Sequence, residues 1–159
     1  RRIDSNLSII QSGRKINEKM PEHVINLTIN AFNESKLKIE NSKILILGIS
    51  YKPNVKDIQL TPAEEIIEKL QEKGAIVHIY DPYFTSNKIF GIVTENNIDG
   101  IIQNIDACII VTGHDEFKKL PISTFNKMLH PILIDTRGIF DPIEAESAKL
   151  IFRGLGRGK

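Results

Sequence analysis

The apolar residues of this chain come in short, nearly unbroken runs instead of alternating with polar residues. Isoleucine is the commonest of them, at 29 of 159 residues against 12 leucines and 5 valines, and β-branched side chains favour strands. The runs are KILILGI at 43–49, AIVHIY at 75–80, ACIIVT at 107–112 and PILID at 131–135. Strands that are apolar on both faces are typical of a parallel sheet covered by helices on both sides. The sequence therefore predicts an α/β fold with these four runs as strands.

Helical patterns separate the runs. The segment 61–74 has apolar residues at helical spacing, a Thr-Pro start with the Thr-x-x-Glu capping pattern, and a glycine at its end. Shorter helices are predicted at 98–105 and 140–150. Because strands and helices alternate along the chain, we expect a doubly wound parallel sheet.

The first 36 residues contain no strand pattern. Ile25, Ile29 and Phe32 form a helical stripe after Pro21, which predicts two helices, or one helix kinked near the proline. A polar stretch then leads into the first strand and indicates a boundary near residue 38.

Composition and charge exclude several classes of protein. The 21 basic residues nearly balance the 20 acidic ones, which gives no electrostatic reason to bind nucleic acid or an anionic membrane. The apolar runs are far shorter than the roughly 18 residues that span a bilayer. A single cysteine excludes a disulfide framework and a thiolate zinc cluster, and it fits a reducing cytoplasm. With no paired histidine ligands, no Ser–His–Asp arrangement and no P-loop, we predict no metal site.

The loop between the first strand and the helix at 61–74 could hold a phosphate. It follows Gly48 and carries Lys52 and Lys56, and the free amides of a helix start attract anions. The loop is longer than the G-x-G-x-x-G dinucleotide fingerprint, however, and has one of its glycines. A plain connecting loop with solvated lysines is the alternative.

Other polar residues also follow predicted strands, at the edge where open α/β sheets bind ligands. Asp81 has the position of a ribose-binding acid, but its Asp-Pro sequence favours a simple turn. His114 could contact a ligand, or it could only cap a short helix that begins near Asp115. Arg137 suits a phosphate or carboxylate, with a surface ion pair as the alternative. Cys108 lies inside an apolar run, so we expect it in the core.

Five segments taken together resemble one family. They are INEKMP at 16–21, LGISYKPNVKDIQLTPAEEII at 47–67, IYDPY at 79–83, VTGHDEF at 111–117 and IDTRG at 134–138. In order and spacing they look like the carboxyl-terminal UDP-binding domain of the UDP-glucose/GDP-mannose dehydrogenase superfamily. The first and last segments look closest to the UDP-N-acetyl-D-mannosamine dehydrogenases. UDP-N-acetyl-D-glucosamine and UDP-glucose 6-dehydrogenases are the alternatives.

The resemblance implies a Rossmann-like domain from a larger oxidoreductase. The family oxidises the primary alcohol of a nucleotide sugar to a carboxylate in two NAD-dependent steps, through a cysteine thiohemiacetal and a thioester. Residues 1–38 would end its central helical region, which makes a homo-oligomer. The stretch around Arg14 and Asn17 would serve as scaffold, with a substrate contact as the alternative. Residues 39–159 would bind the UDP-sugar. The NAD-binding domain and the catalytic cysteine are absent here, so the isolated chain is expected to be inactive.

The family's site residues map onto this sequence by motif. Tyr51 and Lys52 of the YKPN segment and Arg137 of the DTRG segment would contact the nucleotide sugar. Gln59 stands where the family usually has an arginine that reaches NAD, and a neutral amide offers no charge to a pyrophosphate.

Two hypotheses from other classes of protein also fit the sequence. The chain could be a free-standing module that senses a nucleotide without an enzyme around it. It could also be an NAD-binding Rossmann domain in its own right, although the missing G-x-G-x-x-G argues against that.

Overall fold

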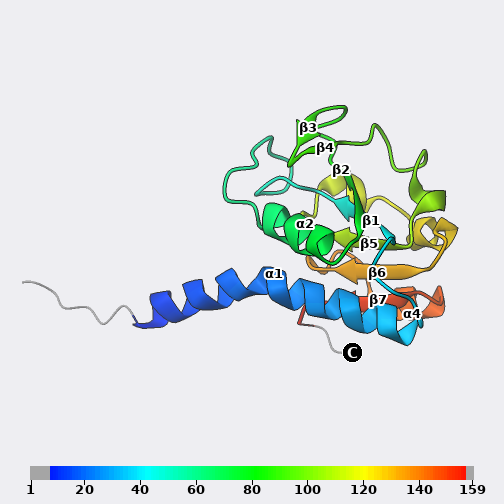
Figure 1. Cartoon of the computed structure of the whole chain (residues 1–159), viewed down its shortest axis with the longest axis horizontal. Helices are drawn as coiled ribbons and strands as arrows, with labels where there is room; N and C mark the ends of the chain where they lie inside the picture. The colour runs from blue at the N-terminus through cyan, green and yellow to red at the C-terminus, as the bar shows by residue number, and fades with distance from the viewer. Residues whose placement is uncertain (1–7, 157–159) are drawn as a thin grey trace, which may run out of the picture.

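Five parallel strands form one sheet in the computed structural model, which describes residues 8–156 (Figure 1). The strands are β1 (Lys43–Leu47), β2 (Ile76–Tyr80), β5 (Ala107–Ile110), β6 (Ile132–Asp135) and β7 (Ile151–Gly154). Their order across the sheet is β2-β1-β5-β6-β7. The chain therefore reverses direction of winding between β1 and β5, which is the switch point of a doubly wound fold. The predicted α/β fold is confirmed.

The central strands explain the unbroken apolar runs. All four residues of β5 and all four of β6 are buried. β1 pairs with β5 in the register Ile44–Ala107 to Leu47–Ile110. Because successive side chains point to opposite faces, each central strand supplies apolar residues to two cores, one on either side of the sheet.

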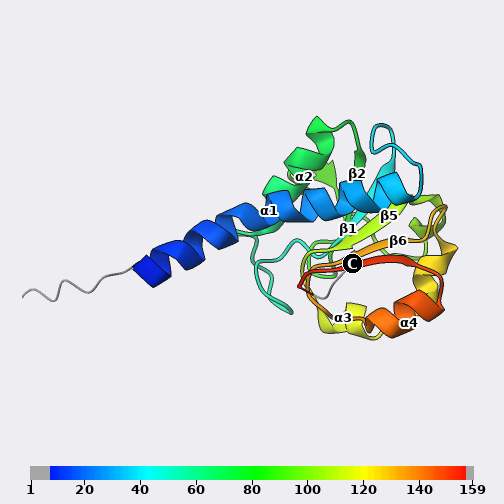
Figure 2. The same ribbon diagram turned by 90° about the horizontal axis from the view of Figure 1, so that it is seen from below.

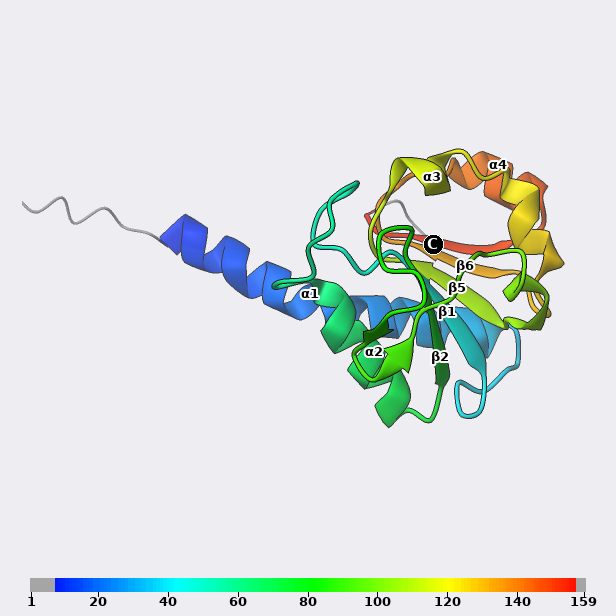
Figure 3. The same cartoon turned by 90° about the horizontal axis from the view of Figure 1, so that it is seen from above.

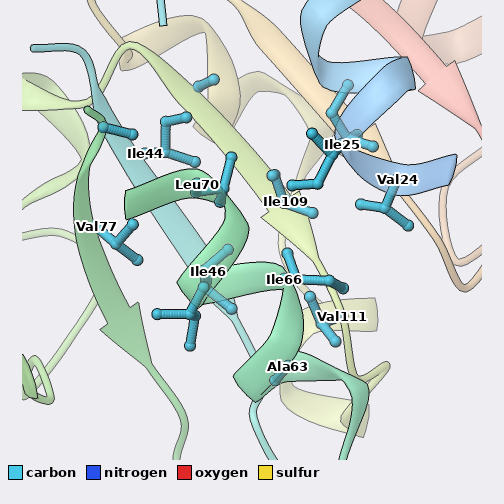
Figure 4. Packing of buried hydrophobic residues seen from close by; sticks show 14 of the residues in the cluster. Val24, Ile25, Ile44, Ile46, Ala63, Ile66, Leu70, Val77, Ile109 and Val111 are labelled. Atoms are coloured by element: carbon cyan, nitrogen blue, oxygen red, sulfur yellow. The ribbon is translucent and has the colours of Figure 1, made fainter. Parts of the chain in front are cut away.

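Two long helices cover one face of the sheet. They are α1 (Ser8–Glu34) and α2 (Pro62–Glu72), and both pack into one apolar cluster. Figure 4 shows Val24 and Ile25 of α1 and Ile66 of α2 directed toward Ile109 of β5. Within residues 8–156, no helix combines the length and the apolar character needed to cross a membrane.

The sequence predicted α2 more accurately than α1. α2 begins as expected, with the Thr61 hydroxyl accepting a hydrogen bond from the backbone N–H of Ala63 and with Pro62 in its first turn. α1 is one helix that contains Pro21, so the two-helix alternative is wrong. Burial of Val24 and Phe32 against the sheet holds the segment helical through the proline, since helices in proteins depend mainly on tertiary packing.

Shorter elements cover the opposite face, where Figure 2 shows α3 and α4 across the sheet from α1. They are η1 (Ile102–Asn104), α3 (Asp115–Lys118), η2 (Ile122–Lys127) and α4 (Pro142–Ser147). The helix predicted at 98–105 is only the 3₁₀ turn η1, because eight residues with Gly100 among them are too few to sustain an α-helix. The helix predicted at 140–150 is confirmed in shorter form as α4.

Three strands have no counterpart in the sequence-based prediction. β7 forms one edge of the sheet, and its residues are mostly half-buried. Arg153 and Gly154 interrupt its apolar pattern, so it does not resemble the central runs. β3 (Lys88–Ile89) and β4 (Ile92–Val93) form a small antiparallel hairpin beside β2.

Candidate functional site

The carboxyl ends of β1 and β5 lie side by side at the switch point of the sheet. β1 is followed by Gly48, which has a φ of +81°. β5 runs on into Thr112, whose hydroxyl donates to the backbone carbonyl of Ser50 at 2.5 Å. The chain leaving β1 is thus fixed against the chain leaving β5 before the loop of residues 51–57 begins. Figure 3 shows this loop projecting away from the sheet before it returns to α2.

Asp81, at the end of β2, is a buried acceptor for donors from several segments. Its Oδ2 accepts from the backbone N–H groups of Ile49 and Ser50, at 2.8 and 3.1 Å, and lies 3.0 Å from Nε2 of His114. Its Oδ1 accepts from the backbone N–H of Tyr83 at 2.9 Å, which forms the expected turn. Burial raises the pKa of Asp81, but the hydrogen bonds from His114, Ile49 and Tyr83 outweigh it and leave the pKa lowered. With both oxygens bonded and no exposed surface, Asp81 has no oxygen free for a ribose.

His114 does something that neither sequence-based alternative described. It is the N-cap residue of α3, but its side chain makes no cap hydrogen bond. The imidazole is fully buried instead, with Nδ1 2.9 Å from the backbone nitrogen of Asn54 and Nε2 against Asp81. The rings of Tyr83 and Phe117 lie 5.2 and 5.3 Å from it, centroid to centroid. His114 therefore connects the loop after β1 to the end of β2.

The loop of residues 51–57 is closed at its base and anchored at its tip. The backbone N–H of Tyr51 donates to the carbonyl of Asp57 at 2.7 Å. At the tip, the Asn54 side chain donates to Oδ2 of Asp115 at 2.9 Å and accepts from the backbone N–H of Asp115 at 3.0 Å. Sequence reasoning missed Asn54. The available signal was the Pro-Asn pair at 53–54, which is typical of a turn, and Asn54 does have a left-handed φ of 62°.

Three of the predicted site residues lie on this loop or just after it. Tyr51 and Lys52 are both exposed, and the Lys52 ammonium lies 5.8 Å from the centre of the Tyr51 ring. A ring and a cation thus stand together on the loop, both accessible to a ligand. Gln59 is also exposed, and its backbone N–H donates to Oδ1 of Asp57 at 2.9 Å.

Arg137 follows β6 at the same edge of the sheet. Its Nε donates to the carbonyl of Val111 at 2.5 Å, and its side chain packs where a Cβ on Gly113 would lie 3.4 Å away. Burial lowers the pKa of Arg137, and the nearby Asp135 partly offsets this. In the part of the chain that the structure describes, no carboxylate lies within ion-pair distance of its guanidinium. The surface ion pair is therefore not formed among these residues.

A cavity of about 450 Å³ opens beside the tip of the loop. It is lined by Asn54, Pro82, Tyr83, His114, Asp115, Glu116 and Lys119. None of the predicted substrate residues borders it, so the cavity and the pair formed by Tyr51 and Lys52 use different surfaces of the same loop.

The middle of the chain matches a known family. Residues 45–142, more than half of the chain, match the model of the UDP-glucose/GDP-mannose dehydrogenase family, UDP binding domain. The chain belongs to this family. The match runs from β1 to the start of α4 and includes the loop, His114 and Arg137, so the candidate site lies inside the family's UDP-binding domain.

Three relatives place the chain within the dehydrogenase family. UDP-N-acetyl-D-mannosamine dehydrogenase from Pyrococcus horikoshii is 32% identical in sequence over 94% of this chain. A solved structure of the Pyrococcus horikoshii enzyme superposes on this chain with a TM-score of 0.83, at 31% identity. That superposition covers 99% of this chain and 35% of the solved chain. NDP-N-acetyl-D-galactosaminuronic acid dehydrogenase from Methanosarcina mazei superposes with a TM-score of 0.86, at 27% identity, over 99% of this chain and 33% of its own. UDP-glucose 6-dehydrogenase from Bacillus subtilis is 30% identical over 94% of this chain and 32% of its own length.

The relatives are much longer than this chain. The chain spans about a third of the curated relatives that it matches, 34% in the case of the Pyrococcus horikoshii enzyme. It is therefore equivalent to one part of a family dehydrogenase, and the Rossmann-like fold of that part is shared with those relatives.

Cys108 is not a reactive thiol in this family member. It lies in the middle of β5 with no exposed surface, and burial raises the pKa of its thiol well above the usual range. A protonated, enclosed thiol is not a nucleophile, and the expectation that Cys108 belongs to the core is confirmed.

Proposed function

We propose that this chain is the UDP-sugar-binding, carboxyl-terminal part of an NAD-dependent UDP-N-acetyl-D-mannosamine dehydrogenase. The complete enzyme would oxidise the sugar's primary alcohol and release UDP-N-acetyl-D-mannosaminuronate. The observation that carries the proposal is the match to the Pyrococcus horikoshii enzyme over nearly the whole chain, together with the family's UDP-binding domain at residues 45–142.

The nucleotide would bind at the carboxyl edge of the sheet, between the loop after β1 and the segment after β6. Tyr51 offers a ring for the base, and Lys52 and Arg137 offer positive charge for the pyrophosphate. Arg137 is exposed, and its guanidinium uses Nε for the Val111 carbonyl. A cation that is held in place by the backbone and has no carboxylate partner among residues 8–156 is well suited to an anionic ligand.

The complete enzyme would contain further domains besides the nucleotide site. Residues 39–159 would form the UDP-sugar domain, and residues 1–38 would end a central helical region through which the enzyme forms a homo-oligomer; residues 1–7 lie outside the described part. NAD, which accepts the hydride, would be held mainly by an amino-terminal domain. Gln59, exposed and uncharged, would face that cofactor across the site.

A cytoplasmic location is supported by the lone, buried cysteine, which needs no oxidising compartment.

A second candidate is a dehydrogenase of the same family that acts on UDP-glucose or UDP-N-acetyl-D-glucosamine. The Bacillus subtilis relative, named as a UDP-glucose 6-dehydrogenase, favours it at 30% identity. None of the predicted contacts distinguishes the sugars, because ring and cations address the UDP part that all three substrates share.

Calorimetric titration of the full 159-residue chain tests the proposal. We expect UDP and the three UDP-sugars to bind, and NAD to bind far more weakly. Binding of NAD without binding of UDP would contradict the proposal and favour an NAD-binding Rossmann domain.

A further inference from the structure

His114 uses both ring nitrogens to connect the loop of residues 51–57 to a buried carboxylate. Its Nδ1 lies 2.9 Å from the backbone nitrogen of Asn54, and its Nε2 lies 3.0 Å from Oδ2 of Asp81. A backbone N–H can only donate, so Nδ1 must accept and carry no proton. An ionised carboxylate can only accept, so Nε2 must carry the hydrogen. One neutral tautomer of the imidazole satisfies both bonds, and neither the other tautomer nor the imidazolium does.

The surroundings of the ring hold it in that orientation. Tyr83 lies on one side, with ring centroids 5.2 Å apart, and Phe117 meets it in an edge-to-face arrangement at 5.3 Å. The imidazole has no exposed surface. If the ring turned over, its nitrogens would lose their partners inside the protein, and a buried polar group without a partner is costly.

The contact with His114 is the least exposed anchor of the loop tip, because the hydrogen bond is partly buried and its acceptor ring is fully buried. The two hydrogen bonds that Asn54 makes with Asp115 are both exposed to solvent, where such bonds contribute little net stability. Tyr51 and Lys52 precede Asn54 by three and two residues, so the position of Asn54 sets the position of the ring and the cation.

We propose that His114 is a positioning residue for the nucleotide-sugar site. In its Nε2-protonated neutral form it fixes Asn54, and through Asn54 it fixes the loop that carries Tyr51 and Lys52. The effect on ligand affinity rests on the proposed function, whereas the ordering of the loop does not. Without the imidazole, Asp81 keeps its bonds to the end of β1, so the tip of the loop is released while the strand remains in place.

Nuclear magnetic resonance on the full 159-residue chain tests the ordering of the loop. We expect the ring nitrogens of His114 to show an unprotonated Nδ1 and a protonated Nε2. In His114→Phe, we expect the Asn54 amide to lose its protection from hydrogen exchange, while the amides of Ile49 and Ser50 stay protected by Asp81. A protonated Nδ1 in the unchanged chain, or an Asn54 amide that is equally protected in His114→Phe, would overturn the proposal.

Titration with UDP tests the effect on the site. We expect His114→Phe to weaken UDP binding about tenfold, the size of one lost hydrogen bond that orders the site. His114→Gln should recover most of that loss, because its carboxamide offers an acceptor oxygen for the Asn54 N–H and an NH2 group that can donate to Asp81. The matched control is His130→Phe, since His130 is also paired with an aspartate, through Nδ1 to Asp106 at 2.9 Å, but before β6 begins. Equal UDP affinity in His114→Phe and the unchanged chain would overturn the proposal.

The experiments separate a failure of the proposed function from a failure of the variant to fold. If the unchanged chain binds no UDP, the proposed function fails, and the tautomer and the exchange of the Asn54 amide still decide whether His114 orders the loop. If His114→Phe does not fold, the tautomer in the unchanged chain and the behaviour of His114→Gln decide it.

Discussion

Gly48 and Thr112 meet at the switch point of the sheet so closely that no side chain fits between them. A Cβ on Gly48 would lie 2.6 Å from the carbonyl oxygen of Thr112 and 2.7 Å from its Cβ. The φ of +81° at Gly48 is also one that residues with side chains rarely adopt. This contact holds the end of β1 against the end of β5. The loop of residues 51–57 follows Gly48 along the chain, and His114 follows Thr112.

Replacing that glycine should therefore destabilise the fold. We expect Gly48→Ala to lower the free energy of unfolding by about 3 kcal/mol, because backbone strain and overlap with Thr112 add together. Gly91→Ala is the matched control. Gly91 has a φ of +78° with nothing within 4 Å of its Cβ position, so only strain of about 1 kcal/mol applies. Urea unfolding of both variants measures the difference, and equal losses would show that the Thr112 contact is unimportant.

Removing either proposed nucleotide cation should weaken UDP binding. We expect Lys52→Gln and Arg137→Gln each to cost about 1.5–3 kcal/mol, the usual size of a hydrogen bond to a charged group. Calorimetry gives the affinities, and added salt should weaken binding by the unchanged chain. Lys73→Gln is the control, since Lys73 is exposed and lies just before β2, where no ligand is proposed.

The same titration followed by amide shifts locates the ligand. We expect the residues whose amides shift to cluster at 48–57 and 135–138. Shifts confined to the cavity beside Tyr83 and Lys119 would place the ligand elsewhere and contradict the assignment.

Gln59 provides a test of the proposed cofactor side. In an enzyme assembled with an amino-terminal NAD domain, Gln59→Arg should tighten NAD binding, because a new charged hydrogen bond is worth about 1.5–3 kcal/mol. Fluorescence titration with NADH measures it. Gln71→Arg, at an exposed position near the end of α2, adds the same charge away from the site and should leave NAD affinity unchanged. An equal response of the two variants would show that Gln59 does not face the cofactor.

Asp81 should make stability depend on pH in the acid range. Its pKa in the folded chain is lowered, so its ionised form stabilises the fold above about pH 4, and this contribution is lost as the pH falls through the folded-state pKa. We expect Asp81→Asn to be about 2–3 kcal/mol less stable at neutral pH, because an amide nitrogen would face buried N–H donors. Its stability should also fall less steeply in acid.

Urea unfolding across the acid range measures both effects. The control is Asp99→Asn, because Asp99 is an exposed carboxylate whose contact with Lys127, at 3.7 Å, is also exposed. That variant should keep the neutral stability and the acid slope of the unchanged chain. The same slope in Asp81→Asn would show that another carboxylate determines the acid response.

Cys108 should be inert in the folded chain. Its burial and raised pKa predict no reaction with an aromatic disulfide reagent until urea unfolds the protein.

The chain should also fail to reduce NAD with any UDP-sugar, as absorbance at 340 nm would show. Rapid labelling of the native thiol, or NAD reduction that persists in Cys108→Ala, would contradict these expectations.

The sequence predicted four of the five strands of the sheet, including β2 at one edge, and missed β7 at the other edge. The runs that became β1, β5 and β6 are buried on both faces, so nearly every residue carries the same apolar signal. β7 has mostly half-buried residues, and Arg153 and Gly154 leave it only two apolar residues, too few to predict a strand. Local signals also predicted α2, because its cap and its proline act within one turn.

The candidate site was less predictable because its parts are joined by contacts between distant segments. Lys52 and Arg137 follow from motifs at strand ends. The role of His114 does not, since it depends on Asp81, 33 residues earlier, and on Asn54, 60 residues earlier. Residues that act through a buried partner from another strand leave no periodic pattern along the chain.

The pairing of the last strand with the first helix has a consequence for synthesis. Arg153 of β7 forms an ion pair with Glu34 of α1, a residue 119 positions earlier, and α1 packs against both β6 and β7. On the ribosome, α1 therefore emerges long before the strands that cover it. A nascent chain interrupted before β7 keeps an unpaired edge on β6 and a partly uncovered apolar stripe on α1, which are both features that promote aggregation. The edge of β6 and the cover of α1 are therefore completed only when β7, the last strand of the described chain, has been made.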